Sequence, residues 1–189
     1  MTVNGTIRRC AKLSLLFVGI LSLVLLGLAI AGDRGLPASE GILNFGKVNG
    51  HLYRGAEPHA SGVKNLKKIG VGAIIDLRMP KEISPDEETE ARADGVTYTN
   101  IPLAGLGRPT DEQVARVLAV IDTSSSPVFV HCEHGCDRTG TIIACYRIRH
   151  DQWTGESALN EAELYGLSRF ERGMRAYISD CAKSANTKK

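Results

Sequence analysis

A thiol and a guanidinium stand six residues apart in a loop that is too short to do much except wrap an anion. They belong to Cys132 and Arg138, in the segment His-Cys-Glu-His-Gly-Cys-Asp-Arg-Thr-Gly at 131–140. An apolar, β-like run at 128–130 precedes the loop, and an apolar, helix-like run at 141–146 follows it. A strand, a tight loop and a helix N-terminus bring backbone N–H groups and the positive end of a helix dipole to one point. The sequence therefore predicts an oxyanion-binding loop.

This loop supplies both an attacking atom and a cradle for its target. The field at a helix N-terminus favours the thiolate form of Cys132, which is the nucleophilic form of the side chain. Arg138 carries a planar fork of donors that can grip two phosphoryl oxygens at once. Together with Arg138, we expect the intervening residues to surround the bound anion: Glu133, His134, Gly135, Cys136 and Asp137.

The same residues resemble the signature of a known enzyme family. The pattern His-Cys-x-x-Gly-x-x-Arg-Ser/Thr of the cysteine-dependent protein tyrosine and dual-specificity phosphatases is matched by His131, Cys132, Gly135, Arg138 and Thr139. The trailing Thr-Gly pair is most similar to the atypical, microbial-type dual-specificity branch. The chain also resembles that catalytic domain at three further segments, which occur in the same order: 53–58, 72–78 and 100–103. The resemblance covers roughly residues 44 to 180, a plausible size for one domain.

The resemblance implies a phosphatase that hydrolyses phosphomonoesters, phosphotyrosine in the first place and phosphoserine or phosphothreonine as alternatives. In this scheme Cys132 attacks phosphorus and forms a cysteinyl-phosphate that water hydrolyses, so no metal and no other cofactor is expected. Thr139 would donate its hydroxyl to the sulfur in the second step, and His131 would orient the loop. The expected partner is a phosphorylated protein or a small phosphoester.

The leaving oxygen also needs a proton from a general acid. In the family that the chain resembles, this acid is an Asp on a separate loop before the cysteine, but the corresponding segment here, 100–109, holds no carboxylate. Two candidates remain. Asp137 lies inside the anion loop, where bound phosphate should keep its carboxyl protonated, and it is the first choice. Asp111 begins the helix after the 104–109 loop, where the helix dipole alone would also explain an acidic residue.

The loop also permits three other interpretations. The same chemistry could act on a phosphoinositide or an inositol polyphosphate, but Glu133 and Asp137 make the cradle comparatively acidic and favour phosphotyrosine. A catalytically silent phosphate-binding module is the alternative from another functional class. A zinc site is disfavoured because its four ligands would alternate along a short loop with no second distant pair. Those ligands would be His131, Cys132, His134 and Cys136.

Strands that alternate with helices predict an α/β domain, with a mostly parallel central sheet flanked by helices on both sides. Strands are expected near 44–54 and at 73–77, 96–100 and 128–130, and helices at 61–68, at 85–93 and from Thr110. Gln113 can complete a capping box with Thr110, and an apolar face follows at Val114, Val117, Leu118 and Ile121. From Thr139 onward the chain is predicted helical, with breaks near Gly155 and Gly166. In such a sheet, ligands bind beyond the carboxyl ends of the strands, where Cys132 falls.

Several side chains outside the loop are large or charged, and the sequence favours a structural position for each of them. Core packing is predicted for Trp153, Leu159, Leu164, Phe170 and Tyr177. Two arginines near the predicted site could contact substrate, although a solvated position is favoured for both: Arg78 and Arg108.

The N-terminal region contains a candidate membrane segment. Residues 13–31 form a run of 19 uncharged residues, and the region 1–12 before it, predicted to be cytoplasmic, carries three basic residues in its second half. At 1.5 Å per residue, this run just crosses a hydrocarbon core about 30 Å thick. It is interpreted either as a transmembrane anchor, with the catalytic domain on the non-cytoplasmic side, or as a signal sequence cleaved near Ala31. In the second case the domain would be secreted or periplasmic.

The remaining chain is divided into a Gly- and Pro-containing linker at 32–43, one phosphatase domain at 44–182 and a disordered tail at 183–189. A formal charge of +2, with scattered basic residues, gives no reason to expect nucleic-acid binding. Five cysteines without regular spacing predict no disulfide framework and at least one free thiol. A reversible bridge between Cys132 and Cys136 is a further hypothesis.

Overall fold

The computed structural model describes residues 41–59 and 61–186 of the chain. The predicted cytoplasmic region, the membrane segment at 13–31 and most of the predicted linker lie outside the described residues. Within the described residues, no helix combines the length and the apolar character needed to span a bilayer.

In this part of the chain, five strands form one sheet in the order β1-β2-β5-β3-β4. All neighbours pair in parallel except β1 and β2, which confirms the predicted mostly parallel sheet. The strands are β1 Gly46–Lys47, β2 Leu52–Gly55, β3 Ala73–Asp76, β4 Thr97–Asn100 and β5 Val128–His131.

The register of β5 places the predicted anion loop at the edge of the sheet formed by the carboxyl ends of the strands. The last residue of β5, His131, pairs with Gly55 at the end of β2 and with Asp76 at the end of β3. Because the three strands are parallel, their carboxyl ends meet at the same edge. The loop that carries Cys132 therefore emerges between the segments that follow β2 and β3.

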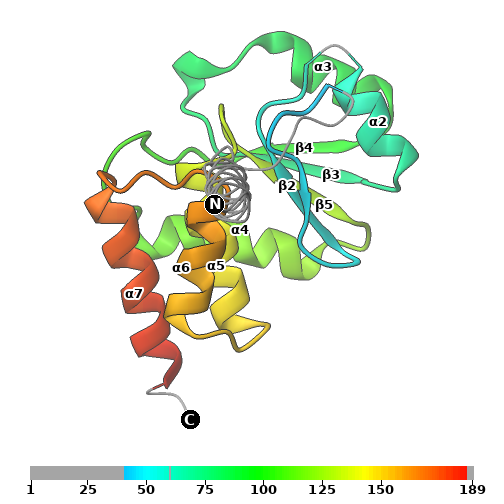
Figure 1. The fold of residues 1–189 in the computed structure, drawn as a ribbon. Coiled ribbons are helices and arrows are strands. Elements are labelled where there is room, and N and C mark those ends of the chain that lie inside the picture. The colour runs from blue at the N-terminus through cyan, green and yellow to red at the C-terminus, as the bar shows by residue number, and fades with distance from the viewer. Residues whose placement is uncertain (1–40, 60, 187–189) are drawn as a thin grey trace, which may run out of the picture. The chain divides into compact units, whose positions relative to one another are not determined.

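Helices cover both faces of this sheet, as predicted. They are α2 Gly62–Lys68, α3 Pro85–Ala93, α4 Asp111–Thr123, α5 Asp137–Arg149, α6 Gly155–Leu164 and α7 Arg172–Asn186, with a short 3₁₀ helix, η1, at Pro80–Glu82. Helices α2 and α3 lie on one side of the sheet, and α4 to α7 lie on the other (Figure 1).

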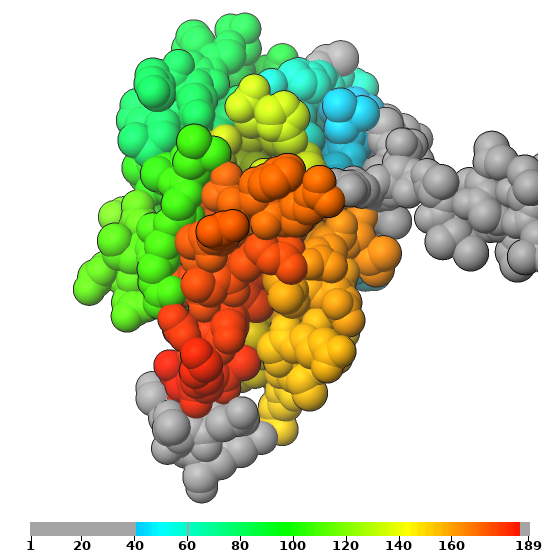
Figure 2. Space-filling model, turned by 60° about the vertical axis from the view of Figure 1, so that its left-hand side comes forward, coloured from blue at the N-terminus to red at the C-terminus, as the bar shows by residue number. Residues whose placement is uncertain are grey.

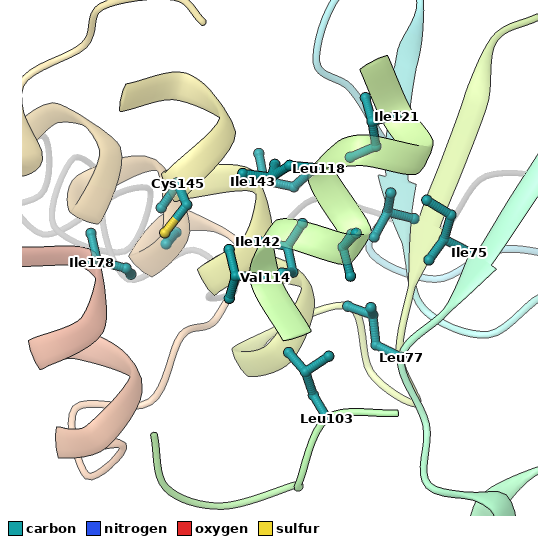
Figure 3. Close-up of a cluster of buried hydrophobic side chains, with 14 of the residues drawn as sticks. Ile75, Leu77, Leu103, Val114, Leu118, Ile121, Ile142, Ile143, Cys145 and Ile178 are labelled. Carbon is teal, nitrogen blue, oxygen red and sulfur yellow. The ribbon is translucent and has the colours of Figure 1, made fainter. Parts of the chain in front are cut away.

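The alternation of side chains along the strands divides the core into two layers. Ile74 and Phe129 point into a smaller cluster with residues of α2 and α3. Their neighbours Ile75 and Val130 point into a larger cluster with residues of α4, α5 and α7, part of which Figure 3 shows. Full burial of one such side chain contributes about 1.5–3 kcal/mol, so β5, buried on both faces, is held firmly beneath the loop.

Local signals for helix ends predicted the helix boundaries well. Helix α3 has the predicted bounds, with the hydroxyl of Ser84 accepting a hydrogen bond from the backbone N–H of Asp86. The capping box at the start of α4 is confirmed, since the Thr110 N–H donates to the Gln113 side chain over 2.9 Å and the Gln113 N–H donates to the Thr110 hydroxyl over 3.2 Å. The predicted inner face of α4 is buried.

Core predictions near the C-terminus were only partly right. Tyr177 is buried, and Trp153 and Leu159 pack against the larger cluster. Leu164 and Phe170 are 67% and 76% exposed, so the prediction for them was wrong. Leu164 is the last residue of α6 and Phe170 lies in the segment before α7, where no element of the described chain covers them.

The ends of the predicted domain also differ from the structure. Helix α7 continues to Asn186, so residues 183–186 are helical rather than part of a disordered tail. Lys183 donates to Asp180 within this helix over 3.0 Å, and Ala185 packs against the larger cluster. At the other end, Ile42 was assigned to the linker but is buried in the smaller cluster.

A disulfide joins Cys145 of α5 to Cys181 of α7, with 5.9 Å between the two Cα atoms. This corrects the expectation that the cysteines form no structural bridge. The two residues are 36 positions apart, and their pairing follows from the packing of α5 against α7, which sequence spacing does not reveal. Cys132 and Cys136 have free thiols, so the hypothesised bridge between them is absent from this structure.

Candidate active site

The anion loop spans the gap between the end of β5 and the start of α5. At its centre, Gly135 has a φ of +69°, and a Cβ atom there would collide with the backbone of Gly55 and Ala56 after β2. Only glycine therefore fits this turn. The loop thus packs closely against the end of β2, and α5 begins directly after it at Asp137.

A small pocket of about 190 Å³ opens above the loop. Its lining includes five residues predicted for the site, namely Cys132, Glu133, His134, Asp137 and Arg138. Three further lining residues were missed by sequence reasoning: Glu82, Gly105 and Leu106. In the space-filling view the yellow-green surface of this loop lies among the green segments that precede α3 and α4 and the orange segment before α7 (Figure 2).

The nucleophile and its predicted hydroxyl partner are both sequestered from bulk water. Cys132 is only 3% exposed, and its free thiol borders the pocket. Thr139 is fully buried in the first turn of α5, and its hydroxyl has no hydrogen-bond partner among residues 41–59 and 61–186. An unpaired buried hydroxyl is costly, so a partner is expected during function.

The guanidinium of Arg138 is buried at the pocket wall and is held from outside the loop. Its Nη1 donates to Glu82 Oε2 over 2.6 Å, and its Nη2 lies 3.9 Å from Glu133 Oε2. Burial acts to lower the pKa of Arg138, but the hydrogen bond to Glu82 raises it overall. Arg138 therefore presents a permanent positive charge beside the thiol.

The two predicted proton donors occupy different environments. Asp137 lines the pocket, and its Oδ1 accepts a hydrogen bond of 2.7 Å from the backbone N–H of Ser168. Asp111 is not among the residues that line the pocket, and its Oδ1 accepts a 2.8 Å hydrogen bond from the Tyr177 hydroxyl. Burial and this bond raise the pKa of Tyr177 to about 12. The structure thus brings Asp137, but not Asp111, to the pocket wall.

His131 is completely buried below the loop. Its Nδ1 lies 3.2 Å from the carbonyl oxygen of Cys132, and its Nε2 lies 2.9 Å from Glu87 Oε1 of α3. The imidazole also stacks on Phe129, with 5.5 Å between ring centroids. These contacts fix the ring between strand and helix, an arrangement suited to orienting the loop.

Arg78 is 1% exposed, so the prediction of a solvated arginine was wrong. It follows β3 and forms ion pairs with Glu57, Asp76 and Glu87. Burial raises the pKa of Asp76 despite His131 and the hydrogen bond from Tyr98. A buried charge is costly unless it is paired, and these three carboxylates pair the buried guanidinium of Arg78 beneath the loop.

Three side chains of the same network lie close enough together to ligate a metal ion. One ligand atom each of Asp76, Glu87 and His131 lies within 4.8 Å of the others. The guanidinium of Arg78 already contacts both carboxylates, with its Nη2 2.8 Å from Asp76 Oδ2. The negative charge of this group is therefore balanced by a side chain of the protein.

A second buried arginine supports the loop from behind. Nη2 of Arg54, in β2, donates to the carbonyl oxygen of Gly135 over 2.8 Å, and its guanidinium lies 3.8 Å from the ring centroid of Tyr165. Burial lowers the pKa of Arg54 to about 10. The role of Arg54 cannot be predicted from the sequence, where it lies within the 53–58 segment, because its contact with Gly135 spans 81 positions.

Two further features lie outside the pocket that contains Cys132. Arg108 is half exposed and pairs with Asp180 over 2.8 Å, outside the pocket lining. A larger cavity of about 510 Å³ is lined by the end of α5, the 152–155 segment and α7. Arg149 is the one charged residue in that lining, and Cys181 there is bound in the disulfide, so the cavity offers no free thiol.

Comparisons with known proteins agree with this geometry. The family described as "DSP-PTPase phosphatase fused to NAD+ Kinase" matches residues 38–179. The dual specificity protein phosphatase TpbA of Pseudomonas aeruginosa (strain UCBPP-PA14) is 29% identical over 167 residues, which cover 83% of this chain and 74% of TpbA. The inositol diphosphatase DSP5 of Arabidopsis thaliana is 26% identical over 148 residues, 72% of this chain and 69% of DSP5.

Solved structures carry the same likeness. The crystal structure of P. aeruginosa TpbA superposes with a TM-score of 0.67 at 26% identity, over 84% of this chain and 98% of that chain. A variant of TpbA in complex with phosphotyrosine gives a TM-score of 0.67 at 25% identity, over 82% and 96%. On its family match, fold and catalytic loop, this chain belongs to the dual-specificity cysteine phosphatases and is a phosphoric monoester hydrolase.

Proposed function

We propose that this protein dephosphorylates phosphotyrosine through a cysteinyl-phosphate on Cys132. The sulfur attacks phosphorus, the P–O ester bond breaks, and the alcohol leaves with a proton. Water then attacks the phosphocysteine, which releases phosphate and restores the thiolate. The observation that carries this proposal is the presence of a free thiol and a buried guanidinium in one small pocket at the N-terminus of α5.

The surrounding residues have distinct roles in this proposal. Arg138 and the loop amides hold the equatorial oxygens of the transferring group, where electrostatic positioning matters most. Thr139, whose hydroxyl is buried and unpaired within the described chain, donates to the sulfur as it leaves. His131 orients the loop through its contact with the Cys132 carbonyl.

The charge of the pocket supports phosphotyrosine over polyphosphorylated substrates. Three carboxylates line it, those of Glu82, Glu133 and Asp137, against one guanidinium. Each additional phosphate on a substrate would meet this acidic lining, at a cost of about 1 kcal/mol per pair of charges 4 Å apart in water. TpbA, a similar protein, has been crystallised with phosphotyrosine, which also supports this choice.

The second candidate keeps the chemistry and changes the substrate. Several relatives, such as DSP5, are inositol diphosphatases, and an inositol diphosphate or a phosphoinositide would use the same thiol and guanidinium. A phosphate-binding module without turnover is the third candidate.

Initial rates on four substrates separate these candidates: a phosphotyrosine peptide, a phosphoserine peptide, a phosphatidylinositol phosphate and an inositol diphosphate. We expect the phosphotyrosine peptide to give a kcat/KM at least about tenfold above the others, equivalent to about 1.4 kcal/mol. A higher value on the inositol diphosphate would assign the protein to the second candidate. Binding of vanadate with no turnover of any substrate would assign it to the third.

We further propose that the catalytic domain is exported, with residues 13–31 as a membrane anchor or, alternatively, as a signal sequence cleaved near Ala31. The sequence of this segment and its basic flank support export. The disulfide between Cys145 and Cys181 supports it independently, because such bonds persist mainly in oxidising compartments.

In protein isolated without reductant from the cells that produce it, we expect Cys145 and Cys181 to resist alkylation until a reductant is added. The double variant Cys145→Ser/Cys181→Ser should lose about 2–4 kcal/mol of unfolding free energy, because the bridge constrains the unfolded chain. Mass spectrometry after alkylation and denaturant unfolding measure the two effects. Reduced wild-type protein is the control and should match the double variant. Rapid alkylation of both thiols without reductant would contradict the export proposal.

A further inference from the structure

The first chemical step leaves one proton unaccounted for, because the ester oxygen needs a donor as its bond to phosphorus breaks. The segment at 100–109 contributes Gly105 and Leu106 to the pocket but no carboxylate. The pocket wall therefore has a position at Gly105 where the backbone approaches and no side chain is present.

Glu82 reaches this position from a different element. It ends η1, just after the segment that follows β3, and its side chain is 25% exposed at the pocket. Its Oε2 accepts hydrogen bonds from the Met79 backbone N–H over 2.8 Å and from Arg138 Nη1 over 2.6 Å. Its Oε1 lies 3.9 Å from where a Cβ on Gly105 would stand. One oxygen is thus anchored, and the other faces the wall that lacks a side chain.

Among the described residues, no oxygen of the other two pocket carboxylates, Glu133 and Asp137, lies within 4 Å of this position. Asp137 Oδ1 is engaged by the Ser168 N–H, which links the start of α5 to the segment before α7. The Glu133 side chain is about half exposed, and its nearest guanidinium contact is 3.9 Å long. We propose that Glu82 is the general acid of the first step and the general base of the second. This inference rests on the proposed phosphatase function.

The proposed steps balance as follows. The Cys132 sulfur forms a bond to phosphorus while the ester P–O bond breaks, and the carboxyl of Glu82 gives its proton to the departing oxygen. In the second step the oxygen of water bonds to phosphorus, the S–P bond breaks, and Glu82 takes a proton from that water. The products are an alcohol and phosphate, and both Cys132 and Glu82 return to their starting states.

Substrate binding provides the required protonation. In the free enzyme, partial burial acts to raise the pKa of Glu82, but the bonds from Arg138 and Met79 lower it overall. A bound phosphate dianion competes for the Arg138 donors and repels the carboxylate, so Glu82 gains affinity for a proton. Other titratable and charged groups near this carboxylate act on it as well: Lys81, Cys132, Glu133, His134, Asp137 and Arg138.

Glu82→Gln tests the proposal with two aryl phosphates that differ in leaving group. We expect kcat/KM on phenyl phosphate to fall by about 10²-fold or more, because phenolate needs the proton. The loss on 4-nitrophenyl phosphate should be much smaller, because 4-nitrophenolate leaves without one. The decline of kcat at high pH on phenyl phosphate should also disappear. A Gln oxygen can still accept from Arg138 and Met79, so a positioning role alone predicts neither effect.

Comparison variants make every outcome decisive. Glu88→Gln removes an exposed carboxylate paired with Arg92 and should leave both rates unchanged. Glu82→Asp retains a carboxyl and should recover part of the phenyl phosphate rate, and thermal unfolding of each variant confirms that it is folded. An equal loss on both substrates in Glu82→Gln would overturn the proposal. So would a loss confined to phenyl phosphate in Asp137→Asn but not in Glu82→Gln. Wild-type protein without activity on either substrate would instead refute the proposed function.

Discussion

Cys132→Ser is expected to abolish phosphatase activity, with kcat reduced by roughly 10⁴-fold or more, because Cys132 carries the one thiol among the described residues of the pocket lining and a serine hydroxyl is a far weaker nucleophile than a thiolate. Serine preserves the loop, the helix N-terminus and Arg138, so the variant should still bind vanadate and a phosphotyrosine peptide. Initial rates and isothermal titration measure the two properties. Retained turnover in the Ser variant would remove Cys132 from its proposed role.

The reactivity of the thiol gives an independent measurement of the same role. In wild-type protein, iodoacetate should modify Cys132 faster than free cysteine at neutral pH, and inorganic phosphate should protect it by filling the loop. Cys136 is the other free thiol of the described chain, and burial raises its pKa to about 11, so it should react slowly. Peptide mapping of the alkylated protein, repeated on Cys136→Ser, assigns the modified residue. An alkylation rate equal to that of free cysteine and unaffected by phosphate would contradict the thiolate mechanism.

The second large effect is expected at Arg138. Arg138→Lys keeps the positive charge but loses the planar fork, so kcat/KM should fall by about 10³-fold, about 4 kcal/mol of transition-state stabilisation. Because the lysine ammonium is a point charge, the affinity for inorganic phosphate should fall much less than kcat. Steady-state rates and phosphate inhibition constants provide the comparison.

A matched substitution shows whether an Arg-to-Lys change lowers the rates when it is made outside the pocket. Arg92→Lys changes an exposed arginine of α3 paired with Glu88, and it should leave the rates unaltered. Because Arg138 also bonds Glu82, the unfolding temperature of Arg138→Lys should be measured alongside its rates. A tenfold or smaller loss of kcat/KM in a folded variant would mean that the loop amides alone hold the transferring group.

Prediction from sequence succeeded where the signal was local. The anion loop, the cap at Thr110 and the strand at 128–130 all depend on residues within a few positions of one another. Capping bonds and apolar alternation act over one or two turns, so they can be predicted without the fold. The same holds for the position of the loop beyond the carboxyl ends of the parallel strands, which is where ligands bind in such sheets.

Prediction failed where a contact crosses the fold. Arg78 was expected in solvent, but Glu87 from α3 and Glu57 after β2 close around it. Glu82 was not considered for the site, because only the path of the chain after β3 brings it to Arg138, 56 positions away. Phe170 was expected in the core because of its residue type, although it is 76% exposed.

By itself, the sequence determined the nucleophile, the arginine beside it and the α/β alternation that positions them, because each is encoded in short-range spacing. The tertiary structure decided which carboxylates reach the pocket, which arginines are buried under the loop, and that Cys145 meets Cys181. The physical reason is that ion pairs, disulfides and pocket walls join residues whose separation along the chain carries no periodic signal. Their partners are specified only when the whole set of elements packs together.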